Sequence, residues 1–262
     1  MAAATVSILA SADYFILLAF RVGGLVVSSP IFGRVNIPIV AKLGLVAALT
    51  FLLFTVFPQT AALGYSTLFG FVLICAGELL LGMAFAYVVN IFFSLTAFTA
   101  GQLIDMQIGF GIVNVFDAQN NTQVPMMGNV LNIILLLMFF VVDGPLILID
   151  MMQLTIDRMP IGTLVFSAAI GITALELFVK SFLLGVMMAL PIIASGLTLE
   201  IAFGMMMRAV PQIHMFVVGI PLKMIVGLSI FLATLPIFVS FSQRIFTELF
   251  KGAELMFANF IG

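Results

Sequence analysis

The stretch that decides the fold is residues 67–100, TLFGFVLICAGELLLGMAFAYVVNIFFSLTAFTA, in which Glu78 is the one charged residue. A helix needs about 20 mostly apolar residues to cross the hydrocarbon core of a bilayer, and this stretch exceeds that length. The whole chain shares its character, since 64% of the residues are hydrophobic and 8% are charged. A soluble domain carries roughly a quarter of its residues as charges, because its surface must be solvated. The composition, with a mean hydropathy of +1.35, therefore predicts an integral membrane protein.

Further apolar segments repeat this pattern and predict an all-α membrane protein with about six long hydrophobic helices. The expected spans are residues 14–29, 37–57, 67–100, 126–142, 163–209 and 215–239, followed by an amphipathic tail at 241–260. Prolines inside the segments predict breaks or kinks, because proline has no N–H to donate and its ring clashes with the preceding turn. These prolines are Pro38, Pro191, Pro221 and Pro236. Small residues four apart predict close helix contacts at Gly24/Ser28, Gly44/Ala48 and Gly185/Ala189.

Two segments do not fit simple spans. Residues 101–125, GQLIDMQIGFGIVNVFDAQNNTQVP, form the longest polar stretch, and their three glycines and Asn-Asn pair favour irregular backbone. Lipid cannot satisfy the hydrogen-bonding groups of irregular backbone, whereas a water-filled cavity can. We therefore expect this stretch to line an aqueous conduit, with an ordinary external loop as the alternative. Residues 146–159 predict a short amphipathic helix, because their polar side chains recur at helical spacing.

Charged side chains within apolar segments need partners, because an unpaired charge is costly there. Glu78 has no opposite charge close in sequence, so it is either protonated or paired with a cation of another helix. The candidate cations are Arg21, Lys42 and Lys223. Glu200 and Arg208 share one helical face at a spacing of two turns.

The sequence offers little for catalysis or metal binding. His214 is the one histidine and Cys75 the one cysteine, so we expect neither a catalytic triad nor a metal site. No cofactor is expected, and the protein is predicted not to be an enzyme. A net charge of −2 without runs of like charge argues against nucleic-acid binding. A secondary transporter stays open as an alternative, although the internal repeat that such a fold favours is weak in this sequence.

Four strings occur in order along nearly the whole chain: SPIFGR at 29–34, ELLLG at 78–82, GQLIDMQIGF at 101–110 and RAVPQIHMFVVGIPLKMIVGL at 208–228. As a set they resemble the FliR family of flagellar export-gate proteins and its injectisome counterparts. The sequence departs from the family at Asp117–Ala118, where members often carry Asp-Pro, and at Asp143–Gly144–Pro145, where they often have a histidine-containing turn.

The resemblance implies a non-enzymatic subunit of the type III protein export gate, in a flagellum or alternatively in an injectisome. It implies assembly with FliP-like and FliQ-like subunits and with an FlhA/FlhB-like apparatus, and transport of unfolded export substrates. The location implied is the bacterial inner membrane, within the flagellar basal body. The fold implied is a fusion of the two partner folds arranged as helical hairpins, with a FliP-like part at residues 14–160 and a C-terminal part at 163–262 that contains the FliQ-like hairpin.

The resemblance also implies a loop that enters the channel and helps to plug it, at about residues 106–123. The expected plug residues are Gln107, Gly109, Phe110, Gly111, Phe116 and Asp117. In this interpretation the two phenylalanines block the lumen, and the two glycines let them move aside. Residues expected to support assembly or to hold buried charge are Glu78, Arg208, Pro211, Gln212, Gly219, Pro221 and Lys223.

Overall fold

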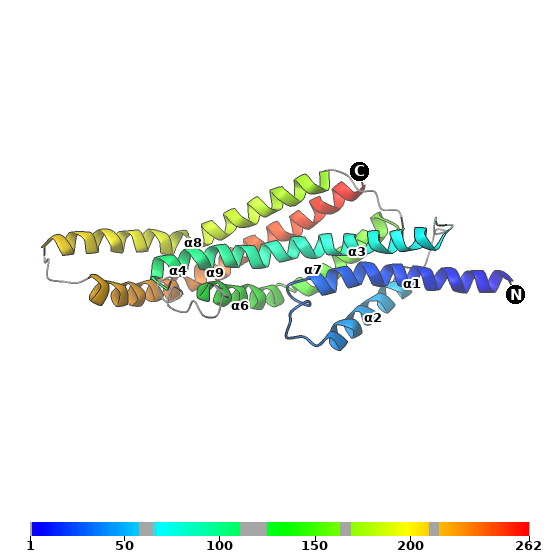
Figure 1. Ribbon diagram of the computed structural model, residues 1–262, viewed down its shortest axis with the longest axis horizontal. Helices are drawn as coiled ribbons and strands as arrows, with labels where there is room; N and C mark the ends of the chain where they lie inside the picture. The colour runs from blue at the N-terminus through cyan, green and yellow to red at the C-terminus, as the bar shows by residue number, and fades with distance from the viewer. Residues whose placement is uncertain are drawn as a thin grey trace. The chain divides into compact units, whose positions relative to one another are not determined.

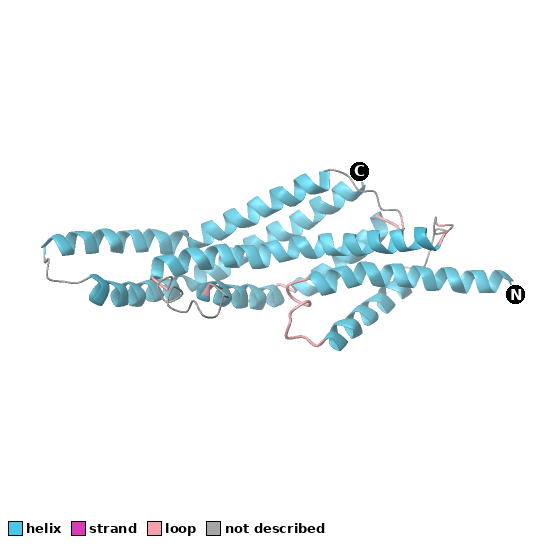
Figure 2. Ribbon diagram, viewed as in Figure 1, coloured by secondary structure: helices cyan, strands magenta, loops and turns pink. Residues whose placement is uncertain are grey.

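The computed structural model describes residues 2–57, 65, 67–110, 125–162, 169–209 and 215–261, and all regular secondary structure in these ranges is helical, as Figure 2 shows. The elements are labelled in Figure 1 and comprise α1 (Ala2–Ser28), α2 (Ile39–Val56), α3 (Leu68–Asn90), η1 (Ile91–Leu95), α4 (Thr96–Ile108), α6 (Met126–Val141), α7 (Gly144–Arg158), α8 (Ala169–Ala209) and α9 (Met215–Ile261). Among the described residues, 5 helical stretches are long and apolar enough to cross a membrane, or up to 6 if the bent pair α6–α7 is one span. The prediction of an all-α membrane protein with about six spans is confirmed. The expected amphipathic helix near 146–159 is α7.

The apolar stretch at residues 67–100 belongs to a helical path that runs from Leu68 to Ile108. The side chain of Thr67 caps its start by accepting a hydrogen bond from the backbone N–H of Gly70, at 3.2 Å. A π-helical turn, η1, separates α3 from α4. The path ends at Gly109, whose φ of 98° lies in the left-handed region that glycine adopts without steric cost.

Helix α9 extends beyond the span expected at 215–239, whereas α8 lies within the segment expected at 163–209. Helix α9 has 47 residues, continues through Pro221 and Pro236, and includes both the expected span at 215–239 and the expected tail at 241–260. Helix α8 has 41 residues and continues through Pro191. Of the expected breaks or kinks, a break is therefore not seen at these three prolines. A proline inside a helix frees one carbonyl, whereas a helix end in an apolar segment leaves about four N–H or four C=O groups unpaired, so continuation is the cheaper arrangement.

The chain folds into two compact units, each built from separate stretches of sequence. The first comprises Met1–Ile91, Asp143–Leu177 and Glu248–Gly262, and the second comprises Phe92–Val142 and Phe178–Thr247. In the first unit α1 packs against α2 and α3, and in the second α4 packs against α6. The division into a part at 14–160 and a part at 163–262 stays a prediction.

Glycine allows close helix packing in the first unit. A Cβ added at Gly82 of α3 would lie 2.1 Å from the carbonyl oxygen of Arg21 in α1, and one added at Gly24 would lie 2.5 Å from the carbonyl oxygen of Leu79. A side chain at either position would therefore separate the two helices. The contact predicted at Gly44 is not seen, because a Cβ there has no neighbour within 4 Å among the described residues.

Aromatic side chains form part of the core of the second unit. Phe93 lies edge-on to Phe139 with ring centroids 5.1 Å apart, and Phe246 lies 5.6 Å from Phe139. All three rings are buried. Such pairs add stabilisation beyond the burial of their apolar area.

Candidate functional site

Helices α4 and α6 hold the two ends of the polar stretch. A Cβ added at Gly101 of α4 would lie 2.2 Å from both the backbone nitrogen and the Cα of Gly128 in α6, so the two backbones are in direct contact. Asp105 of α4 accepts a hydrogen bond on Oδ1 from the backbone N–H of Met127, at 3.2 Å. That N–H belongs to the first turn of α6, where the helix itself supplies no acceptor. The carboxylate of Asp105 therefore caps a helix that begins on the far side of the polar stretch.

The sequence did not predict this role of Asp105, which is one of the polar residues of the stretch at 101–125. Asp105 is 1% exposed, and its Oδ2 has no hydrogen-bond partner among the described residues. The available signal was a carboxylate one turn before a glycine that ends a helix, together with Pro125, which ends the polar stretch and precedes α6. Both ends of the stretch are thus fixed to each other by backbone packing and by one hydrogen bond from the backbone to a side chain.

Three of the six expected plug residues lie in the described part of the chain. Gly109 ends α4 in the left-handed conformation, and Phe110 follows it with a half-buried side chain. The side-chain oxygen of Gln107 is buried without a hydrogen-bond partner in the described part. Gly111, Phe116 and Asp117 lie outside the described residues. The role of all six as a plug stays a prediction.

A second polar contact joins α8 to α9. The Nζ of Lys223 lies 2.5 Å from Oε1 of Glu200, and their side chains are 17% and 41% exposed. Arg208, which shares a face with Glu200, is exposed and has no ion pair within the described ranges.

Lys42, another of the candidate cations for Glu78, has a different partner. Its Nζ donates to the backbone carbonyl of Gly33, at 2.9 Å.

The partner of Glu78 is Arg21. The Nε of Arg21 lies 2.6 Å from Oε2 of Glu78, and both side chains are fully buried, at 0% exposure. The other carboxylate oxygen of Glu78 accepts from the backbone N–H of Gly162, at 2.8 Å. Arg21 also donates to the carbonyl oxygen of Met159 at 3.1 Å and to that of Thr155 at 3.4 Å. This network joins α1, α3 and the C-terminal end of α7.

A smaller polar contact involves Tyr65, which lies outside the candidate spans. The hydroxyl of Tyr65, in the connection before α3, donates to a carboxylate oxygen of Asp13 in α1. This hydrogen bond to a charged acceptor raises the pKa of Tyr65 above its ordinary value, because it stabilises the protonated phenol, and burial acts in the same direction.

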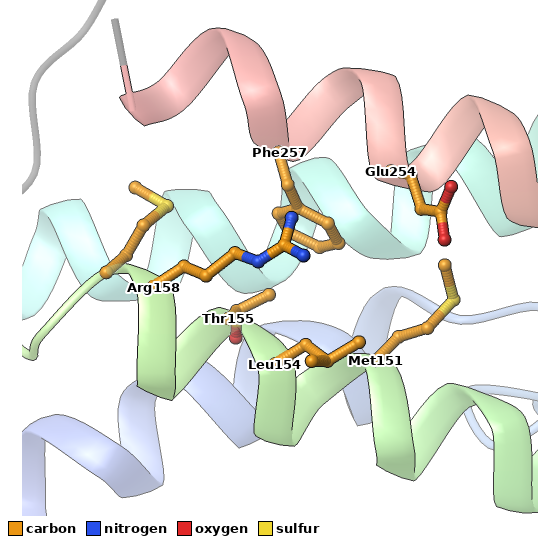
Figure 3. Close-up of a pocket in the computed structure, with 7 residues that line it drawn as sticks. Met151, Leu154, Thr155, Arg158, Glu254 and Phe257 are labelled. Atoms are coloured by element: carbon orange, nitrogen blue, oxygen red, sulfur yellow. The ribbon is translucent and has the colours of Figure 1, made fainter.

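An apolar cavity of about 40 Å³ lies between α7 and the end of α9, and Figure 3 shows its lining side chains. The side chains of Arg158 and Glu254 both reach it, and neither forms an ion pair or hydrogen bond in the described part of the chain. The other lining residues are Met151, Leu154, Thr155, Met159 and Phe257. Within the described ranges, no group of three or more His, Cys, Asp or Glu side chains is placed to hold a metal ion.

The remaining residues expected to support assembly are divided between the described and undescribed parts. Gly219 is buried and Pro221 is exposed on α9. Pro211 and Gln212 lie outside the described residues, as does His214. The assembly role of all of them stays a prediction.

Comparison with known proteins gives a consistent result over most of the chain. The family model described as "Bacterial export proteins, family 1" matches residues 12–249. The chain is 31% identical to the flagellar biosynthetic protein FliR of Escherichia coli (strain K12), covering 88% of this chain and 87% of that protein. It is 27% identical to the protein of the same name from Aquifex aeolicus (strain VF5), covering 92% of each. It is 26% identical to that of Bacillus subtilis (strain 168), covering 89% of this chain and 90% of the relative.

Proposed function

The chain belongs to the bacterial export proteins, family 1, and on this premise we propose that it is a non-enzymatic subunit of the flagellar type III protein export gate. The observation that carries the proposal is the match to flagellar relatives over about nine-tenths of each chain, 92% in the case of the Aquifex protein. Its long apolar helices make the chain a multi-pass membrane protein. A subunit of an export gate in the membrane needs such helices. The flagellar names of the relatives favour the flagellum over the injectisome.

We further propose that residues 106–123, within the polar stretch, help to close the channel against small solutes. Its ends are held by the Gly101–Gly128 contact and by the cap that Asp105 provides to α6, so the segment between them starts and finishes at defined positions. A segment anchored in this way can lie across an aqueous conduit that satisfies its polar groups. Phe110 supplies a bulky apolar ring directly after the end of α4.

FliP-like and FliQ-like subunits are the proposed partners, together with an FlhA/FlhB-like apparatus and unfolded export substrates. Exposed apolar side chains support the existence of partners or lipid around the chain: in α2 they include Ile39, Val40, Leu43, Phe51, Leu52 and Val56. Only 11% of the α2 segment is buried within the chain. The proposed location is the bacterial inner membrane, at the flagellar basal body.

Co-purification tests this assignment. The chain would be expressed alone and with its FliP-like and FliQ-like candidate partners, and the detergent-solubilised product would be sized. A stable large complex that forms only with those partners supports an export-gate subunit. A well-behaved monomer or homodimer that ignores the partners contradicts it and favours a secondary transporter.

A further inference from the structure

Three polar side chains from three helices line one small cavity in the second unit. They are Gln107 of α4, Ser195 of α8 and Lys223 of α9, and the other residues that line the cavity are apolar or glycine. Each of the three belongs to a helical stretch that is long and apolar enough to cross a membrane. Polar groups in such stretches need hydrogen-bond partners, because neither lipid nor apolar side chains supply any.

The hydrogen bonds of the described part satisfy these side chains only in part. The buried Oε1 of Gln107 has no partner there. The ammonium group of Lys223 has three N–H groups, and its contact with Oε1 of Glu200 at 2.5 Å uses one of them. The hydroxyl of Ser195 donates to the carbonyl oxygen of Ile192 at 2.8 Å, so its own oxygen can still accept. The cavity is therefore lined by two available acceptors and by one donor with further N–H groups.

The charges around the cavity restrict what it can bind. The ammonium group of Lys223 disfavours a cation, whereas the amide oxygen of Gln107 and the nearby carboxylate of Glu200 disfavour an anion. An apolar ligand would leave Oε1 of Gln107 unpaired. A neutral molecule that both donates and accepts hydrogen bonds fits these groups. The cavity volume of about 10 Å³ corresponds to one such molecule of the size of water.

We propose that Gln107, Ser195 and Lys223 form a binding site for a single water molecule that bridges α4 to α8 and α9. The water accepts an N–H of Lys223 and donates to Oε1 of Gln107 and to Oγ of Ser195. About three hydrogen bonds are typical of a buried water molecule. The water hydrates the charge of Lys223 within an apolar stretch, where a charge without polar partners is costly. The site is independent of the proposed export function, since only residues of this chain form it.

A density map of the purified protein tests the site directly. It requires crystallography or electron cryo-microscopy at a resolution that shows ordered water. We expect a peak at about 2.5–3.2 Å from both Oε1 of Gln107 and Nζ of Lys223. The peak should be absent from the variant Gln107→Leu, in which an apolar side chain of similar size replaces the acceptor. A map that shows ordered water elsewhere and no peak here would overturn the proposal.

Thermal unfolding in detergent provides a second measurement, in which the sign of the effect decides. If water pairs with Gln107, the variant Gln107→Leu loses a hydrogen bond, and its melting temperature should fall by about 2–4 °C. If Oε1 is unpaired, the same change removes an unsatisfied buried oxygen and raises the melting temperature. A rise or no change would therefore contradict the site. The matched control is Gln102→Leu at an exposed position of α4, which should leave the melting temperature unchanged.

A double variant tests whether one water molecule joins two of the side chains. Gln107→Leu and Ser195→Ala each remove one partner of the same water molecule. The loss in melting temperature of the double variant should therefore be smaller than the sum of the two single losses. Additive losses would show that no shared water molecule connects Gln107 to Ser195, and would overturn the bridging role.

Discussion

Arg21 and Glu78 form a fully buried ion pair, with Nε of the arginine 2.6 Å from Oε2 of the glutamate. The pair connects α1 to α3 at the level of the Gly24 and Gly82 packing contact, since the carbonyl oxygen nearest to an added Cβ at Gly82 is that of Arg21. The same carboxylate accepts the backbone N–H of Gly162, beyond the end of α7. One charged pair therefore joins three separate stretches of the first unit.

We predict that Arg21→Met and Glu78→Gln each lower the stability of the purified gate by about 3–5 kcal/mol, because each leaves a buried group without its partner. The measurement is thermal unfolding in detergent. The double variant Arg21→Met/Glu78→Gln should lose less than the sum of the two single variants, since no lone charge is left buried. Additive losses would show that the two side chains do not act as a pair.

Gly101→Ala should strongly weaken the hairpin of α4 and α6. Its Cβ would lie 2.2 Å from backbone atoms of Gly128, which cannot turn away as a side chain would. We expect destabilisation of about 1–3 kcal/mol or more, typical of overpacked sites. Gly171→Ala is the matched control, because its Cβ enters open space, and it should be neutral or stabilise α8 by up to about 1 kcal/mol. Similar unfolding curves for the two variants would contradict the contact.

The apolar segments predicted the class of fold well, because the bilayer sets the length and composition of a spanning helix. Glu78 was recognised as needing a partner, but the choice of Arg21 depends on how α1 and α3 pack, across 57 residues of sequence. The packing role of Gly101 and Gly128 could not be recognised from their neighbours in the sequence, because it arises from the contact of one glycine with the other. Proline was expected to break or kink the apolar helices, but α9 continues through Pro221 and Pro236 without a break.

Asp105→Ala should loosen the start of α6. It removes the acceptor of the Met127 N–H, and losing a helix cap costs about 0.5–2 kcal/mol. Amide hydrogen exchange of the assembled gate would show faster exchange in the first turn of α6, with the helix centre unchanged. Asp105→Asn retains a side-chain oxygen and should show a smaller increase. Unchanged protection in the alanine variant would exclude a capping role.

Lys223→Ala should reduce the yield of the assembled complex, because it leaves Glu200 of α8 without its cation. The double variant Lys223→Ala/Glu200→Ala should recover part of that yield, since the unpaired carboxylate is then absent. The measurement is the amount of complex obtained by size-exclusion chromatography at equal expression. A normal yield for the single variant would refute the predicted role of Lys223 in assembly.

Removal of residues 109–120 from the chain within the assembled gate tests the channel-closing role. We predict that the complex forms in normal amount, because the deletion spares Asp105, Gly101 and Gly128, and that the gate becomes leaky. Leak would be measured as the entry of ions or small dyes into cells or vesicles that contain the complex. An assembled gate that lacks these residues and stays as tight as its parent would contradict the proposal that the polar stretch closes the channel.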